Sequence, residues 1–231
     1  MTMHNPRKSV STTSTSGTHP APVTPRRLLA RIAPERAVEV VAPHGVAAGR
    51  MMLRALTESD REPFLATING SRAHLERWIP LNNPGESDDA FFERQLQLVS
   101  TGDSQGTAWR RIGVLPSGEI VGGFNLNAIS RGLQSSADMN WWIAKGHTRQ
   151  GLAREGILST LRHAFADLPL GLGLHTIHAG IAPENDASIR LALSLGFSHE
   201  RGVQSYLRVG ERWELHDIYA MTVLDAHALA G

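Results

Sequence analysis

Basic and small residues crowd the start of one predicted helix, in the stretch KGHTRQGLAREG from Lys145 to Gly156. Helix N-termini ordinarily attract Asp or Glu, because their exposed N–H groups and the helix dipole favour negative charge. This turn holds a single acid, Glu155, among the donors Arg149, Gln150 and Arg154 and the small residues Gly151 and Ala153. Backbone N–H groups at such a turn can bind a diphosphate. The alternative interpretation is an ordinary basic, solvated turn.

The apolar spacing around this turn predicts an alternation of strands and helices in one large domain. The predicted strands are residues 37–43, 49–56, 107–115, 120–130, 135–144, 173–182, 200–209 and 212–223. The predicted helices are residues 57–79, 87–102, 151–165 and 183–197, the last with Asn185 as its N-cap and Gly196 just past its end. The basic turn from Lys145 to Gly151 therefore lies between a predicted strand and a predicted helix, where a ligand can reach it.

Composition limits the classes of function. The 231-residue chain contains no cysteine, so disulfides, thiolate metal sites and a cysteine nucleophile are excluded. No apolar run approaches the roughly 20 residues needed to span a bilayer, which predicts a soluble, cytoplasmic protein without a membrane partner. No arrangement of ligands indicates a metal, and no P-loop or Gly-x-Gly-x-x-Gly follows a strand.

The charge is unevenly distributed along the chain. Residues 1–36 hold six of the 23 basic residues and one of the 22 acids, so the remaining chain has 17 basic and 21 acidic residues. The acidic body argues against direct binding of nucleic acid and favours a cationic amine. The Ser/Thr/Pro-rich tail, residues 1–36, is predicted to be disordered, and residues 37–231 to form the domain. A transit peptide and a true start near Met51 or Met52 are alternatives for the tail.

Several motifs in order resemble the GNAT superfamily of acetyl-CoA-dependent N-acyltransferases. The turn reads Thr148-Arg149-Gln150-Gly151-Leu152-Ala153, where that family has Gln/Arg-x-x-Gly-x-Gly/Ala. With MMLRALTESD, GGFNLNAIS, NWWIAKGHTRQGLAREG and APENDASIRLALSLGF, the chain looks like the RimJ/RimL branch, which acetylates ribosomal-protein N-termini. The resemblance spans roughly residues 50–223. Thr148 departs from the pattern, so Arg149 or Gln150 is expected to replace its contact.

The resemblance implies an α+β (α/β three-layer) GNAT fold. Its mixed, mostly antiparallel twisted sheet should have about seven strands, about four flanking helices and splayed central strands. The splay should free backbone N–H groups near Trp142, Ile143 and Ala144 for pantetheine and the thioester oxygen. The implied CoA-binding residues are Trp142, Ile143, Ala144, Arg149, Gln150, Gly151, Leu152, Ala153, Arg154, Asn185 and Ser188. Trp141 should face the opposite side from Trp142, so at most one of them lines the site.

Transfer of an acetyl group from a thioester to an amine needs a base and help for the departing thiolate. The resemblance places Asp138 where many GNAT enzymes carry a catalytic Glu, and a relay through water is the expected route for its proton. A solvent-facing strand residue is the alternative. His178 competes for the role of base, because an unperturbed imidazole has a pKa of about 6.5, although a structural histidine is the commoner outcome.

The Asn-x-x-Ser pattern of the branch implies that Asn185 contacts pantetheine and that Ser188 reaches the sulfur of CoA. Ordinary capping of the helix by Asn185 is the alternative, and the two roles are compatible. Ala192 stands where many GNAT enzymes carry an acidic Tyr, which fits the serine version. Ser205 stands where RimL has a Glu proposed as catalytic. Trp78 and Asn125 are candidate acceptor-binding residues, and a packing role is equally open for them.

The resulting hypothesis is direct attack by a primary amine on acetyl-CoA, which acts as co-substrate, in a ternary complex. A protein or peptide N-terminus is the favoured acceptor, because an α-amine has a pKa of about 7.7–8.0 and is partly neutral near pH 7.5. A polyamine, an aminoglycoside or a peptide antibiotic is an alternative acceptor, and a non-catalytic CoA-binding regulatory module is an alternative function. The oligomeric state is left open between a monomer and a homodimer.

Overall fold

The structure is a computed structural model that describes residues 45–209 and 212–228. The predicted strand 37–43 and the turn at residues 210–211 lie outside the described residues. The division into a tail, residues 1–36, and a domain, residues 37–231, therefore stays a prediction. Among the described residues, no helix is both long and apolar enough to cross a membrane.

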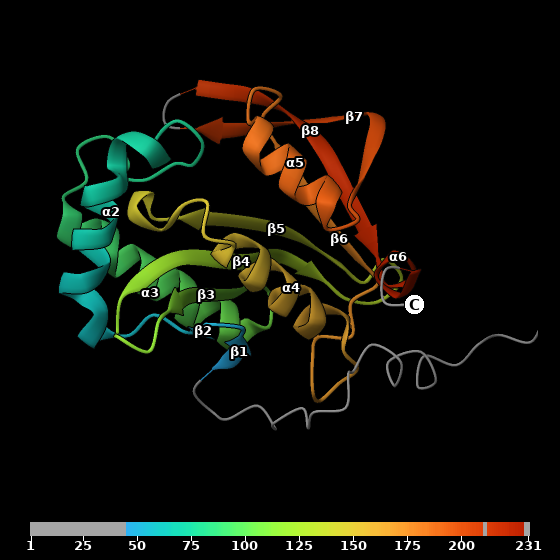
Figure 1. Cartoon of the computed structure of the whole chain (residues 1–231), viewed down its shortest axis with the longest axis horizontal. Coiled ribbons are helices and arrows are strands. Elements are labelled where there is room, and N and C mark those ends of the chain that lie inside the picture. The colour runs from blue at the N-terminus through green and yellow to red at the C-terminus, as the bar shows by residue number, and fades with distance from the viewer. Residues whose placement is uncertain (1–44, 210–211, 229–231) are drawn as a thin grey trace, which may run out of the picture.

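Eight strands form one sheet in the order β1-β2-β3-β4-β5-β6-β8-β7 (Figure 1). The strands are β1 Val46–Ala48, β2 Met51–Arg54, β3 Trp109–Val114, β4 Ile120–Ser130, β5 Ser136–Ile143, β6 Thr176–Ile181, β7 Ser198–Val209 and β8 Arg212–Thr222. Neighbouring strands are antiparallel except β5 and β6, which are parallel. This confirms the mixed, mostly antiparallel sheet that the sequence predicts.

Five α-helices and two short 3-10 turns accompany the strands in the described part of the chain. The helices are α2 Arg61–Leu75, α3 Asp88–Gln105, α4 Leu152–Phe165, α5 Asp186–Ser194 and α6 Val223–Ala228, and the 3-10 turns are η1 Glu58–Asp60 and η2 Lys145–His147. Asn185 caps α5 as predicted, and Gly196 follows its end with a φ of 94°.

The observed eight strands and five α-helices of the described residues agree with the predicted sheet of about seven strands and about four helices, but strand β1 and helix α6 were not placed from the sequence. The additional strand β1 pairs with β2 through a turn at Gly49, whose φ is 61°. The additional helix α6 begins with a reciprocal cap, which the sequence shows as Thr-x-x-Asp. The Thr222 hydroxyl accepts a hydrogen bond from the Asp225 amide at 3.2 Å, and the Asp225 carboxylate accepts one from the Thr222 amide at 2.8 Å.

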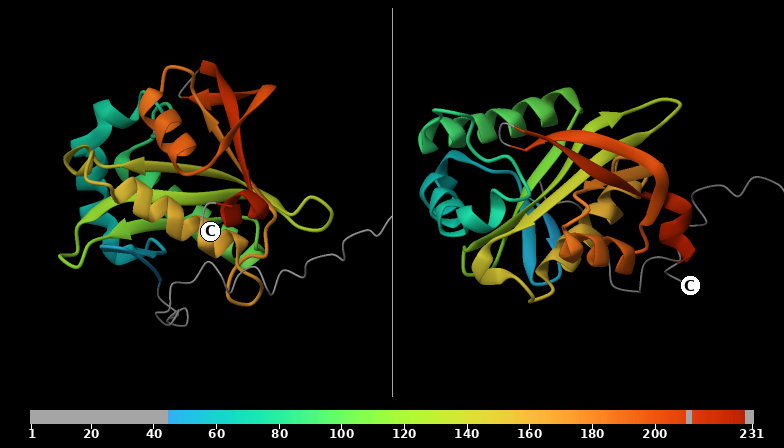
Figure 2. Two further views of the ribbon diagram at one scale, coloured as in Figure 1. Left: turned by 45° about the vertical axis from the view of Figure 1, so that its right-hand side comes forward. Right: turned by 90° about the horizontal axis from the view of Figure 1, so that it is seen from above.

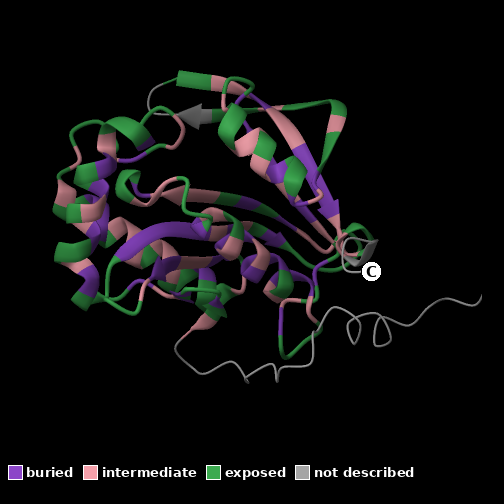
Figure 3. Cartoon of the chain, in the orientation of Figure 1, coloured by how far each residue is buried: buried purple, intermediate pink, exposed green. Residues whose placement is uncertain are grey.

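Two layers of helices cover the two faces of the sheet (Figure 2). On one face, α2 and α3 pack through Phe64, Ile68 and Phe92 against β3 and β4. On the other face, α4 and α5 pack against alternate residues of β4, β5, β6 and β8. Figure 3 shows buried residues on the strands and on the helix sides that face them. Because side chains alternate along a strand, each central strand supplies one face to each layer.

Gly156 sets how closely α4 approaches the sheet. A Cβ atom at this position would overlap the ring of Phe124, which is fully buried on β4. We expect Gly156→Ala to lower the free energy of unfolding by about 1–3 kcal/mol, as overpacking does, despite the better helix propensity of alanine. Urea denaturation would measure the change.

Gly70 on α2 is the matched control, because nothing lies within 4 Å of an added Cβ there. Gly70→Ala should raise stability by up to about 1 kcal/mol. If both substitutions stabilise the protein, the close contact between α4 and β4 is not a constraint on the fold.

Candidate functional site

A fork opens between β5 and β6 in the middle of the sheet. Only three pairs join these strands, Ser136 with Thr176, Ala137 with Ile177 and Asp138 with His178. Beyond this point β5 continues to Ile143 and β6 to Ile181, but the two strands no longer pair with each other. The two halves of the sheet consequently diverge toward the left of Figure 1. The predicted splay of the central strands is confirmed, and it leaves backbone groups of β5 without a strand partner.

The amides that face the fork differ from the predicted ones. The Ala144 amide donates to the Val121 carbonyl oxygen at 2.8 Å, so it is already used. Alternate amides of an antiparallel strand point to the same neighbour, so the Trp142 amide also points toward β4, where Trp142 pairs with Gly123. The Trp141 and Ile143 amides point the other way, toward the fork. Of the predicted window 142–144, only Ile143 offers its N–H to a ligand there.

The start of α4 is a bare helix N-terminus. Its N-cap is Gly151, with a φ of 82°, and no side chain caps the first turn. The amides of Leu152, Ala153 and Arg154 have no intrahelical acceptor, as in any α-helix. The absence of a Cβ at Gly151 and the short side chain of Ala153 let an anion approach these amides. The arrangement fits the diphosphate of acetyl-CoA on the chemistry of its donors.

The side chains around this turn are less free than the sequence suggests. Gln150 donates through Nε2 to the Gly146 carbonyl oxygen at 3.1 Å, and Arg154 donates through Nη1 to the Ser194 carbonyl oxygen at 3.3 Å. Thr148, the departure from the family pattern, donates to the Lys145 carbonyl oxygen at 3.1 Å. Arg149 is exposed, and its guanidinium has no partner among the described residues. Of the two arginines at this turn, Arg149 is therefore the one whose guanidinium is available to a bound anion.

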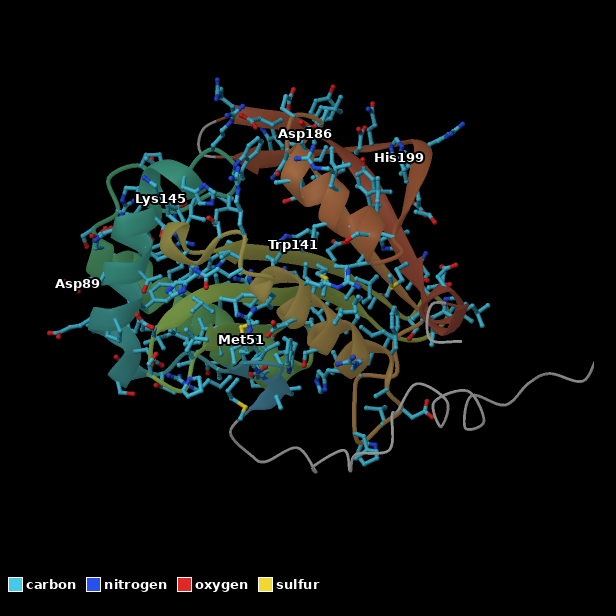
Figure 4. All side chains as sticks on the ribbon, viewed as in Figure 1. Met51, Asp89, Trp141, Lys145, Asp186 and His199 are labelled. Carbon is cyan, nitrogen blue, oxygen red and sulfur yellow. The ribbon has the colours of Figure 1, made fainter. Side chains whose placement is uncertain are left out.

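Asn185 and Ser188 lie together at the start of α5. The Asn185 Oδ1 accepts a hydrogen bond from the Ser188 amide at 3.2 Å, which confirms the predicted cap. The Ser188 side chain is half-buried, and its hydroxyl has no partner among the described residues. Figure 4 shows Asp186, the first residue of α5, and Trp141 on β5 on opposite sides of the fork. Both α4 and α5 pack against the same core, so the starts of the two helices lie on the same face of the sheet.

Asp138 and His178 lie on the other face of the sheet. The neighbours of Asp138 on the strand, Ala137 and Met139, are buried in the core under α4, so Asp138 points away from that core. Asp138 is exposed and pairs in register with the half-buried His178. The structure therefore brings the two candidate bases into one row at the base of the fork.

Two further polar residues of this row, Asn127 and Asn140, were not among the predicted site residues, whereas Asn125 was. Asn127 pairs in register with Asp138, and its Oδ1 is buried without a hydrogen-bond partner among the described residues. Asn125 donates through Nδ2 to the Asn140 Oδ1 at 2.9 Å. The alternation in Phe124-Asn125-Leu126-Asn127 is the signal that could have found Asn127. The side chains of Asn125, Asn127, Asp138 and Asn140 together form a polar strip beside the fork.

The tryptophans divide between packing and the rim of the site. Trp141 packs against the core under α4. Trp142 lies across Gly123 and meets Phe64 edge to face at 6.3 Å between ring centroids. The two thus face opposite sides, as predicted. Trp78 is half-buried beyond the end of α2, with the Arg77 guanidinium 4.6 Å from its ring centroid. Trp78 is absent from both core clusters, which leaves it available to a ligand.

The segment after Trp78 is tied to α3 by one ion pair. Arg94 donates from Nε and Nη2 to the two carboxylate oxygens of Glu86, each at 2.7 Å, and from Nη2 to the Leu81 carbonyl oxygen at 2.9 Å. These hydrogen bonds lower the pKa of Glu86 to about 2. A carboxyl whose pKa falls on folding stabilises the protein above its unfolded pKa and stops doing so as the pH drops toward its folded pKa.

We expect Glu86→Gln to lower the free energy of unfolding by about 1 kcal/mol at pH 6, a figure discounted for solvent screening. The deficit should shrink as the pH falls from about 4.5 toward 2. Urea denaturation at pH 6 and pH 3 would measure it. Glu62→Gln is the control, because Glu62 is exposed and has no charged partner among the described residues. A deficit independent of pH would show that the loop is held by packing instead.

A separate cavity of about 490 Å³ lies between α2, the β3–β4 turn and the loop after β5. Its polar lining includes Thr67, Ser71, Glu119 and His147. Apart from Ala144, it contains none of the predicted site residues. Among the described residues, no cluster of three or more His, Asp or Glu side chains is placed to hold a metal ion.

Comparison with known proteins agrees with this geometry. The family model described as "Acetyltransferase (GNAT) domain" matches residues 50–198. The chain therefore belongs to the GNAT acetyltransferase family. A curated relative, the uncharacterized N-acetyltransferase YoaA of Bacillus subtilis (strain 168), is 27% identical over 158 residues, which are 68% of this chain and 85% of YoaA. The chain is an acetyl-CoA-dependent N-acetyltransferase of the GNAT type.

Solved structures place it near the predicted branch. Mycobacterium smegmatis RimJ in complex with CoA-disulfide superposes with a TM-score of 0.69 at 26% identity, covering 83% of this chain and 93% of RimJ. Spermidine N-acetyltransferase from Vibrio cholerae, in complex with CoA and spermine, superposes with a TM-score of 0.61 at 23% identity, covering 77% and 98% of the two chains. The second likeness shows the fold alone.

Proposed function

We propose that this N-acetyltransferase acetylates the N-terminal α-amine of a protein or peptide. The observation that carries the proposal is the polar strip at the base of the fork, where the exposed Asp138 and the half-buried His178 offer acceptors to an amine. The likeness to RimJ, which extends over 93% of that chain, supports this class of acceptor. An α-amine with a pKa of about 7.7–8.0 needs only a weak base near neutral pH.

On the face that carries α4 and α5, this chain would hold acetyl-CoA. The amides of Leu152, Ala153 and Arg154, with the Arg149 guanidinium, would bind the diphosphate. The Asn185 side chain and the Ile143 amide would bind the pantetheine arm between α5 and β5. Acetyl-CoA supplies the acetyl thioester that the amine attacks. The Trp141 amide, which also points toward the fork, can stabilise the negative charge that develops on the thioester oxygen.

On the opposite face, Asp138 would accept the proton of the attacking amine through a water molecule, with His178 beside it as the alternative acceptor. Ser188 would donate a hydrogen bond to the departing thiolate. Trp78 and Asn125 would line the approach of the peptide. Because base and thiolate donor lie on different faces, the amine and acetyl-CoA would meet from opposite sides in one ternary complex.

The test is an acceptor panel with purified protein and acetyl-CoA, read by release of free CoA and by mass spectrometry. Peptides with free N-termini should be modified, and the same peptides with blocked N-termini and a free lysine should not. Modification of spermidine or an aminoglycoside instead would contradict the proposal and show that the acceptor is a small-molecule amine. CoA binding without transfer to any acceptor would make the chain a non-catalytic CoA-binding module.

A further inference from the structure

Arg50, in the turn between β1 and β2, holds the carboxylate of Glu155 in the first turn of α4. Its Nε and Nη2 donate to Glu155 Oε1 at 2.9 and 2.7 Å, and its backbone amide donates to Oε2 at 2.9 Å. Both carboxylate oxygens are therefore engaged by one residue. The β1–β2 turn and the helix start are more than a hundred residues apart in the chain, and this contact joins them.

The contact also shapes the loop before the helix. Arg50 Nη2 donates to the Gln150 carbonyl oxygen, between Arg149 and Gly151, whose φ values are 60° and 82°. Positive φ is uncommon for a residue with a side chain, so the Arg149 conformation needs support from its surroundings. Gly49 completes the arrangement, because a Cβ there would overlap the Glu155 carboxylate.

The charge of Glu155 matters for a bound anion. Glu155 is the only acid in the first turn of α4, beside the uncapped amides. The hydrogen bond from Arg50 lowers the pKa of Glu155, so the carboxylate stays ionised in the folded protein. Without a partner it would repel a diphosphate at the amides. With Arg50 in place, the local charge of the pair is close to zero.

We propose that Arg50 is a positioning residue for acetyl-CoA, which neutralises Glu155 and fixes the Gln150 carbonyl so that the first-turn amides of α4 can bind the diphosphate. This inference rests on the proposed placement of the diphosphate. Arg50 acts through Glu155 and the loop, without touching the reacting atoms. It assigns a binding role to the β1–β2 turn, an element that contributes no residue to the predicted site.

The test measures the Kd of CoA by calorimetry for Arg50→Gln, Glu155→Gln and the double variant. Arg50→Gln should raise the Kd about tenfold or more, because an uncompensated charge then lies beside the anion. Glu155→Gln alone should leave the Kd unchanged or lower it. The double variant should bind CoA more tightly than Arg50→Gln does, although its thermal stability should not recover. A purely structural role predicts no such rescue.

Two controls separate the possible failures. Arg50→Lys keeps the charge and serves if Arg50→Gln does not fold, with a Kd expected between those of the wild type and the double variant. The KM for acetyl-pantetheine, which lacks the diphosphate, should be the same in all variants. Wild-type protein that does not bind CoA would contradict the proposed function. If the wild type binds CoA and Arg50→Gln has the same Kd, the proposed role of Arg50 is wrong. It is also wrong if Glu155→Gln raises the Kd as much as Arg50→Gln does.

Discussion

Replacing Ala153 with glutamate is expected to raise the Kd for CoA about 100-fold or more while making the free protein slightly more stable. Ala153 is the second residue of α4, where the first-turn amides are uncapped. A carboxylate there interacts favourably with the helix dipole, by about 0.3–1 kcal/mol. The same carboxylate repels a diphosphate at these amides by about 3 kcal/mol at a separation of about 5 Å and an effective dielectric constant near 20.

Ala153→Gln is the matched control, because it adds the same bulk without the charge. Calorimetry gives the Kd, and thermal unfolding without CoA gives the stability. The difference between the two variants should decrease at high salt, which screens exposed charges. If Ala153→Glu and Ala153→Gln bind CoA equally well, the diphosphate does not lie at the start of α4, and the CoA part of the proposed function is wrong.

Replacing Asp138 with asparagine is expected to lower kcat about 10²- to 10⁴-fold, the usual range for loss of a general base. The KM for acetyl-CoA should stay near its wild-type value, because Asp138 lies on the face opposite α4 and α5. Stability should change little, since Asp138 is exposed and has no ion pair among the described residues. Steady-state kinetics with a peptide acceptor would measure both constants.

His178→Gln decides between the two candidate bases, because His178 pairs with Asp138 across the base of the fork. A large loss in His178→Gln with near-normal activity in Asp138→Asn would assign the base to His178. Equal, moderate losses in both would indicate that they share the proton through water. Normal activity in both variants would move the base away from this row of the sheet.

The local elements of the fold were predictable because each is determined by short-range periodicity. The strand at residues 120–130 was predicted with its observed bounds, and α5 was predicted with its N-cap, Asn185. The errors lie where short-range signals are weak. Strand β1 has three residues, too few for a period, and the Thr-x-x-Asp cap of α6 was read as the end of a strand.

The candidate site was predicted less completely. The bare start of α4 was predictable from the residue types around Gly151, because Gly151 and its nearest neighbours lack the side chains that cap a helix. The first-turn N–H groups of such a helix must be satisfied by water or a ligand. The free amides were predicted as 142–144, but the strand register gives the Trp142 and Ala144 amides to β4. Register depends on a partner strand, so the residue pattern of one strand cannot reveal it.

The sequence by itself therefore determined the family, the order of the elements from β2 to β8, and the uncapped, donor-rich start of the helix after β5, because these depend on residue types at short spacing. Only the tertiary structure decided that Asp138, His178 and Asn127 share one row and that the backbone amide of Ile143 points toward the fork. The same holds for the ion pair between Arg50 and Glu155. These facts depend on which distant segments meet, and that is settled by packing of the whole sheet between its two helix layers.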